Sequence, residues 1–109
     1  MTESYAYITE LRAQLPEITP DTIVSRTLYN EGAVRGVLFG FAPGQELSEH
    51  TSAMQAILHI LEGTATLTLG ADVIEAGPGA LAYMPPNLPH SVRAHEQVVM
   101  LLTMIKGAA

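Results

Sequence analysis

The chain is made of short apolar runs separated by turn residues, and this pattern predicts strands. Runs rich in Val, Ile, Leu and Thr occupy residues 21–29, 33–41, 56–61, 64–69, 73–76, 80–84, 90–94 and 98–105. Within residues 64–69, threonines alternate with Ala65, Leu67 and Leu69, which is the period of two of a half-exposed strand. Eight or so short strands, with no long helical segment to cover a parallel sheet, favour an all-β sandwich or barrel.

Two segments differ from simple alternation. Ile8, Leu11 and Leu15 are spaced as on one helix face, and Pro16 ends the pattern. We therefore expect one short helix in an N-terminal extension, residues 1–20, ahead of a barrel domain over residues 21–109. Residues 98–105 are apolar at both odd and even positions, so both faces of this strand are apolar. The strand is therefore either central in a sheet or covered by a second subunit.

Composition narrows the possible functions. With 109 residues the chain fits one domain. Five Lys and Arg against eleven Asp and Glu give a net charge of -6, so we do not expect a nucleic acid partner. The sequence has no cysteine, which excludes disulfides, thiolate metal sites and a catalytic Cys. No apolar stretch approaches the ~20 residues of a membrane span, and the start lacks a secretory pattern, so we expect a cytoplasmic protein outside the membrane.

Two stretches form a recognisable pair of motifs. The first is PGQELSEHTS at residues 43–52, continued by ILEG at 60–63, and the second is GALAYMPPNLPH at residues 79–90. In this order and spacing they resemble the two motifs of the cupins, and the chain resembles a small single-domain, RmlC-like member. The resemblance implies an all-β jelly-roll barrel. In many members its mouth holds Fe, Mn, Ni, Cu or Zn on three His and one Glu.

The implied metal ligands are only half present. His50 matches the first ligand and His90 the last, but Ser52 stands at the second His position and Ala56 stands where the Glu belongs. The second motif also has Pro85-Pro86-Asn87 in place of Pro-x-Gly. Because Asn tolerates the left-handed backbone that Gly supplies, we expect this turn to form.

The other histidines are weaker candidates. Ala56 stands at a barrel-facing position, and Leu58, two residues on, should face the barrel as well. His59 should therefore lie on the opposite face of its strand. A bulge in that strand would reverse the assignment and make His59 a ligand. His95 follows the end of its strand and is interpreted as a solvated loop histidine.

These observations leave two functional hypotheses. In the first, the barrel binds a small, weakly polar organic molecule as a binding or sensing module, and its pocket contains His50, Ser52, Ala56, Leu58, His90 and Val92. In the second, the protein is a metal-dependent oxygenase or isomerase that holds a divalent metal (Zn, Fe, Mn or Ni) on His50 and His90. The first hypothesis needs no cofactor. Under either one we expect a homodimer, from the resemblance and from the two-sided apolar run at residues 98–105.

Overall fold

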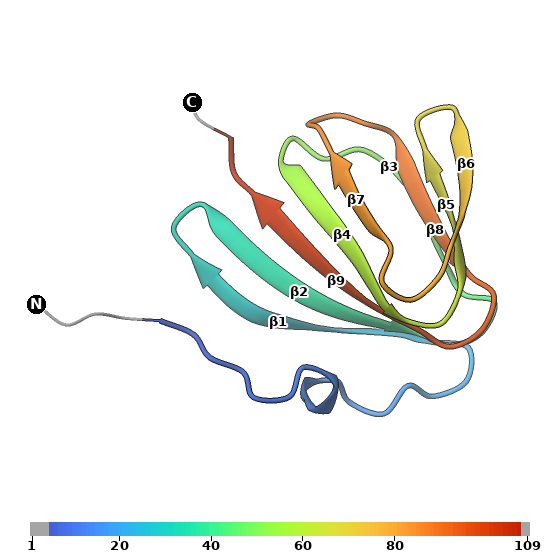
Figure 1. Ribbon diagram of the computed structural model, residues 1–109, viewed down its shortest axis with the longest axis horizontal. Coiled ribbons are helices and arrows are strands. Elements are labelled where there is room, and N and C mark those ends of the chain that lie inside the picture. The colour runs from blue at the N-terminus through green and yellow to red at the C-terminus, as the bar shows by residue number, and fades with distance from the viewer. Residues whose placement is uncertain (1–4, 108–109) are drawn as a thin grey trace, which may run out of the picture.

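The computed structural model describes residues 5–107 and consists of nine antiparallel strands in two sheets. The all-β jelly-roll prediction is confirmed. The five-stranded sheet has the order β1-β2-β9-β4-β7 and the four-stranded sheet the order β3-β8-β5-β6 (Figure 1). The strands are β1 (Ile23–Glu31), β2 (Val34–Phe41), β3 (Glu46–His50), β4 (Gln55–Glu62), β5 (Ala65–Leu69), β6 (Asp72–Ala76), β7 (Leu81–Met84), β8 (His90–Ala94) and β9 (Val98–Ile105).

The core lies between the two sheets and follows from strand alternation. On β4 the residues Ala56, Leu58 and Ile60 are buried, while those between them are only half-buried. The same alternation on β8 buries Val92 and Ala94 against them. Each large apolar side chain fully buried in this way stabilises the fold by roughly 1.5–3 kcal/mol. The two sheets therefore enclose one interior, and the inward parity of each strand defines its lining.

β9 occupies the centre of the five-stranded sheet, hydrogen-bonded to β2 on one side and β4 on the other. Its inward residues Val98 and Met100 belong to the core, and Val99 on its outer face packs with Leu38 of β2. The two-sided apolar run is thus explained by a central strand. The part of the chain that the structure describes contains no helix long and apolar enough to cross a membrane.

The N-terminal segment packs on the outer face of the five-stranded sheet. Leu15 and Ile18 join a second apolar cluster with Leu38 and Val99. Gly40 makes this approach possible, because a Cβ at that position would lie 2.6 Å from Cδ1 of Ile18. The segment that precedes β1 therefore packs against the sheet backbone at Gly40, where no side chain blocks it.

The helix expected over residues 8–15 does not form. Only a 3-10 turn is present, Arg12–Gln14, with hydrogen bonds from Gln14 N to Leu11 O and from Leu15 N to Arg12 O. The segment is too short to repay helix nucleation, its N-cap residue Leu11 has no side-chain acceptor, and Pro16 prevents extension. Contact of Leu15 with the sheet decides its conformation instead.

Candidate functional site

Two histidines from distant parts of the sequence face each other on neighbouring strands. His50 ends β3, His90 begins β8, and the two residues are direct cross-strand partners. Their ring centroids lie 4.2 Å apart with the planes at 60°. His90 is buried, whereas His50 is exposed at the rim. The pair lies at the end of the sandwich where β4 begins and β7 ends (Figure 1).

Both imidazoles are held by the same backbone contact. Nδ1 of His50 lies 2.8 Å from the Ser48 carbonyl oxygen, and Nδ1 of His90 lies 2.8 Å from the Leu88 carbonyl oxygen. Since a carbonyl oxygen only accepts, each Nδ1 carries a proton and donates it. In the neutral rings, Nε2 then carries the lone pair. The site thus presents two Nε2 acceptors on adjacent rings whose orientation is set by the backbone.

Nε2 of His90 has no partner in the described part of the protein although the residue is buried. This nitrogen makes no hydrogen bond within residues 5–107. In the same part of the chain, every fully buried side-chain nitrogen or oxygen has a hydrogen-bond partner. Nε2 of His90 is therefore not completely enclosed by the described chain.

The inner face beneath the histidines is apolar. His90, Val92 and Ala94 alternate inward on β8. Ala56 on β4 lies between Met84 and Met104, its cross-strand partners, and Leu58 is 1% exposed one step deeper. Ala56, Leu58 and Val92 thus form part of the packed core. They act as a floor beneath the histidines rather than as the walls of a deep pocket.

Ser52 lies in the loop between β3 and β4 and is tied to the second motif. Its Oγ accepts a hydrogen bond from Met54 N at 3.2 Å, and its carbonyl oxygen accepts one from Asn87 N at 2.7 Å. Asn87 has a φ of 65°, so the prediction that Asn would supply the left-handed conformation is confirmed. This turn positions the loop that leads into His90.

His59 lies on the face of β4 opposite Ala56 and Leu58. Its cross-strand partners are Leu81 of β7 and Leu101 of β9, and the side chain is half-buried. A bulge does occur between β4 and β9, but only between Ile60 and Glu62, beyond His59. The structure therefore does not bring His59 to the His50–His90 pair.

A complete metal shell does not fit the residues at the mouth. Within residues 5–107 no three His, Cys, Asp or Glu side chains are grouped so that they could hold an ion. Ala56 offers no ligand atom, and the Ser52 hydroxyl already accepts a backbone hydrogen bond. The available protein ligands are the two Nε2 atoms, half the number in a typical four-ligand site.

The sequence did not predict two other residues on this inner face, Met104 and Arg35. Met104 flanks Ala56 on the side opposite Met84, and Arg35 of β2 is the cross-strand partner of Met104. Arg35 is exposed near the end of its strand. Only the strand pairing places these residues at the same level as Ala56, and a single sequence carries no signal for that register.

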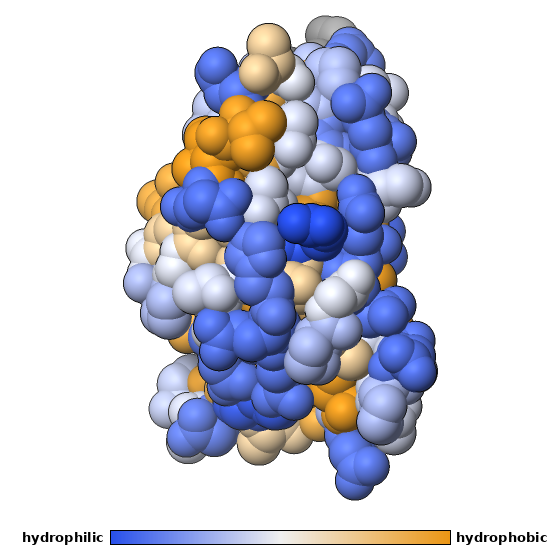
Figure 2. Space-filling model, turned by 90° about the vertical axis from the view of Figure 1, so that its right-hand side faces the viewer, coloured by the Kyte–Doolittle hydropathy of each residue, from blue (hydrophilic) through white to orange (hydrophobic). Residues whose placement is uncertain are grey.

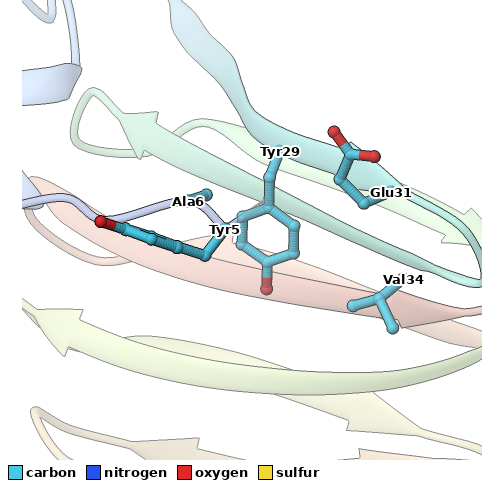
Figure 3. A pocket seen from close by; sticks show the side chains of 5 residues that line it. All are labelled: Tyr5, Ala6, Tyr29, Glu31 and Val34. Atoms are coloured by element: carbon cyan, nitrogen blue, oxygen red, sulfur yellow. The ribbon is translucent and has the colours of Figure 1, made fainter. Parts of the chain in front are cut away.

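A cavity of about 500 Å³ lies elsewhere, beside the turn between β1 and β2 (Figure 3). The residues around it are Tyr5, Ala6, Tyr29, Glu31 and Val34. Tyr29 pairs with Gly36 on the outer face of the sheet. This cavity is therefore separate from the histidine pair, which faces the interior.

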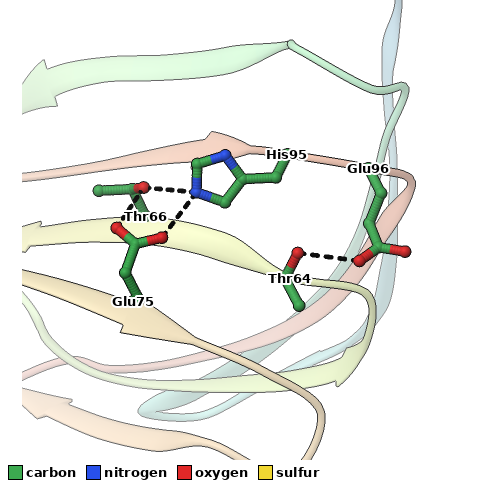
Figure 4. A network of polar contacts seen from close by, with 5 residues as sticks. All are labelled: Thr64, Thr66, Glu75, His95 and Glu96. Atoms are coloured by element: carbon green, nitrogen blue, oxygen red, sulfur yellow. Dashed lines mark hydrogen bonds and ion pairs between the residues drawn. The ribbon is translucent and has the colours of Figure 1, made fainter.

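His95 is not simply a solvated loop residue. Its Nε2 lies 2.6 Å from Thr66 Oγ1 and 2.8 Å from Glu75 Oε1 (Figure 4). The Thr66 hydroxyl also donates to Glu75 Oε2 at 2.7 Å. These two donors, the Thr66 hydroxyl first and His95 second, lower the pKa of Glu75. The cluster lies on the outer face of the four-stranded sheet, because Thr66 alternates with the buried Ala65 and Leu67.

That outer surface is mainly polar. Figure 2 shows the side of the molecule that carries β5, β6 and β8 as predominantly hydrophilic, with separate apolar patches. The outer face of the five-stranded sheet differs, since an apolar cluster covers part of it. At the end of the sandwich that holds His50 and His90, polar side chains lie next to the apolar core.

Comparison with known proteins agrees with this architecture. A family model described as Cupin domain matches residues 37–106, which include both histidines. The fold is a double-sheet jelly-roll barrel, with the His50–His90 pair at one end. The chain belongs to the cupin family. A search of the curated proteins found no match.

Several solved structures share the fold. A conserved protein of unknown function from Streptococcus pyogenes is 30% identical, with 98% of this chain and 93% of that chain covered and a TM-score of 0.84. A cupin superfamily protein from Desulfitobacterium hafniense is 24% identical, with 84% of each chain covered and a TM-score of 0.80. KdgF from Halomonas is 17% identical, with 97% and 96% covered and a TM-score of 0.76. The last two similarities concern the fold alone.

Proposed function

We propose that this cupin is a binding or sensing module for a small, weakly polar organic molecule at the mouth of its barrel. The observation that carries the proposal is the pair of Nε2 acceptors fixed above an apolar floor. Such a site favours a ligand with hydroxyl or amide N–H donors on an apolar body. His50 and His90 would accept these hydrogen bonds, Ser52 would lie at the rim, and the packed residues Ala56, Leu58 and Val92 would form the apolar layer beneath the bound molecule.

The same residues argue against catalysis by side chains alone. The alanine at position 56 removes the motif carboxylate that would serve as a general base. The Ser52 hydroxyl interacts with Met54 N, and no hydrogen bond from it to a histidine is present in the described chain. A serine nucleophile needs such a base. A role in binding requires neither group.

The test is a thermal-shift screen of neutral polyols and amides, with hits ranked against carboxylate analogues. Binding should be lost in His90→Gln and in Ala56→Phe, whose larger side chain would have to displace the packed floor, and should persist in Thr51→Ala and His59→Ala. Arg93 is exposed on the outer face of β8, paired with Thr66. Binding that depends on His59 or Arg93 would place the binding surface outside the barrel. Hits confined to carboxylates and abolished by Arg35→Gln would overturn the weakly polar ligand class.

A second candidate function keeps a divalent metal, Zn, Fe, Mn or Ni, on His50 and His90. It is supported by the two backbone contacts, because a carbonyl bound to Nδ1 is the usual support of a metal-ligating imidazole. Water or the bound molecule would have to complete the shell. When bound, such an ion supplies Lewis acidity or oxygen activation, as in an oxygenase or isomerase.

Metal analysis of protein purified without a His tag separates the two candidates. Stoichiometric metal that disappears in His50→Ala and His90→Ala, and is released as the pH falls below about 6, would favour the metal enzyme. Metal that survives both substitutions would exclude these residues as its ligands. Absence of binding under several loading conditions would favour the cofactor-free module.

We further propose that the protein is a homodimer. The support is the outer face of the five-stranded sheet at β7, where Leu81 is 69% and Tyr83 57% exposed beside the half-buried Ile57 and Leu101. Light scattering should give twice the chain mass of 11.6 kDa. Leu81→Lys should reduce that mass, whereas the matched control Val73→Lys, equally exposed on β6, should not. A monomeric wild type would contradict the proposal.

A further inference from the structure

The cavity beside the β1–β2 turn has two aromatic walls and one acidic group. Tyr5 and Ala6 come from the N-terminal segment, Tyr29 and Glu31 from β1, and Val34 from β2. Figure 3 shows the Tyr29 ring nearly face-on at the centre, the Tyr5 ring nearly edge-on to one side, and Glu31 to the other side. Its volume of about 500 Å³ falls within the range of small-molecule sites.

The Tyr29 ring is held in place by a glycine on the neighbouring strand. Gly36 is its cross-strand partner, and a Cβ there would lie 2.6 Å from Cζ of Tyr29. The ring therefore lies across the bare backbone of β2, a position that any larger residue at 36 would block. Tyr29 thus offers a preorganised ring face, which lowers the conformational cost of binding a ligand.

The charge beside these rings is negative. Glu31 is exposed and forms no ion pair within residues 5–107. The net charge of -6 adds a field that attracts cations. An aromatic face attracts a cation through its quadrupole, and the attraction is greatest for cations that lose little hydration on binding. Two rings and a carboxylate around an open cavity are the features of an aromatic cage.

We propose that this cavity is a second binding site, specific for a methylated or quaternary ammonium group. The methylated nitrogen would lie against the Tyr29 ring, Tyr5 would form the second wall, and Glu31 would supply the balancing charge. A neutral apolar ligand would not use Glu31, and an anion would be repelled by it. The site is independent of the histidine pair, because Tyr29 and Gly36 lie on the outer face of the sheet whereas His50 and His90 face the interior.

The test uses choline and its neutral carbon isostere, 3,3-dimethylbutan-1-ol, in parallel NMR titrations of the ¹⁵N-labelled full chain. Choline should shift the amide resonances around Tyr29 and Glu31 and bind at least about fivefold more tightly than the isostere. Resonances around His90 should not move. Equal binding of the two compounds, or no shift with millimolar choline, would overturn the proposal.

Variants then separate the cage from a general effect on folding. Tyr5 is 87% exposed, so Tyr5→Leu removes one wall without removing core packing and should weaken choline binding about fivefold. Glu31→Gln should weaken it by about two- to fivefold, and Tyr29→Phe, which keeps a ring, should largely retain it. Val73→Ala removes an exposed apolar side chain on β6, outside both proposed sites, and should have no effect. Choline affinity unchanged in both Tyr5→Leu and Glu31→Gln would overturn the assignment.

Discussion

The two faces of the four-stranded sheet carry histidine sites of opposite construction. On the inner face His50 and His90 each donate from Nδ1 to a backbone carbonyl, and both Nε2 atoms remain available. On the outer face His95 uses its Nε2 on Thr66 and Glu75, two side chains of the adjacent hairpin β5–β6. The backbone orients the two inner rings and leaves both Nε2 atoms without a partner in the described chain. In the outer ring, Nε2 is already bonded to side chains of the fold. This difference is why we propose the inner pair, and not His95, as the binding site.

The largest expected effect is on stability. Removing the buried His90 ring leaves a cavity and an unpaired Leu88 carbonyl, so His90→Ala should lower the free energy of unfolding by about 2 kcal/mol. His95→Ala removes only exposed contacts and should cost less than about 1 kcal/mol. Equilibrium urea unfolding measures both. An equal or greater loss in His95→Ala would show that the exposed cluster contributes more to stability than the buried His90 ring, contrary to this prediction.

The turn before His90 should show the next effect. A β-branched side chain resists a φ of 65°, so Asn87→Val should destabilise the protein by about 1–2 kcal/mol. Asn87→Gly adopts this conformation freely and is the matched control. The same urea experiment reports the result. If valine and glycine were equally well tolerated, the left-handed conformation at Asn87 would not be needed for the inner site.

A smaller, pH-dependent effect should appear at the outer site. Hydrogen bonds from Thr66 and His95 hold the pKa of Glu75 below its ordinary value of 4.5. Its stabilising contribution is therefore present above pH 4.5 and is lost as the pH falls through the lowered pKa. The difference in Tm between wild type and Glu75→Gln should shrink in that acidic range. Glu17→Gln, in the N-terminal segment, is the control and should give no such trend.

The smallest perturbation is a spectroscopic one that needs no substitution. The inner histidines should be protonated on Nδ1 in their neutral form, whereas His95 should carry its proton on Nε2, because that atom faces the Glu75 carboxylate. Long-range ¹H–¹⁵N spectra at neutral pH distinguish the two tautomers. A proton on Nε2 of His50 or His90 would remove the acceptor pair from the proposed site.

The sequence by itself determined the family and most of the strands, but it missed β3, because residues 46–50 are mainly polar and form no apolar run. Alternation is a local property, so the strands expected at residues 90–94 and 98–105 have the same bounds as β8 and β9. The asparagine in the second motif predicted the left-handed turn, because only a few residue types accept that conformation. Position 56 shows directly that the motif carboxylate is missing.

Only the tertiary structure decided which residues meet. Cross-strand partners such as His50 and His90, or Tyr29 and Gly36, depend on a register that no single segment encodes. The same holds for His95, which reads as an isolated loop residue until β5 and β6 bring Thr66 and Glu75 to it. The N-terminal segment has helical spacing, yet Leu15 and Ile18 pack against the sheet. Burial against a distant surface outweighs a local preference that spans barely two turns.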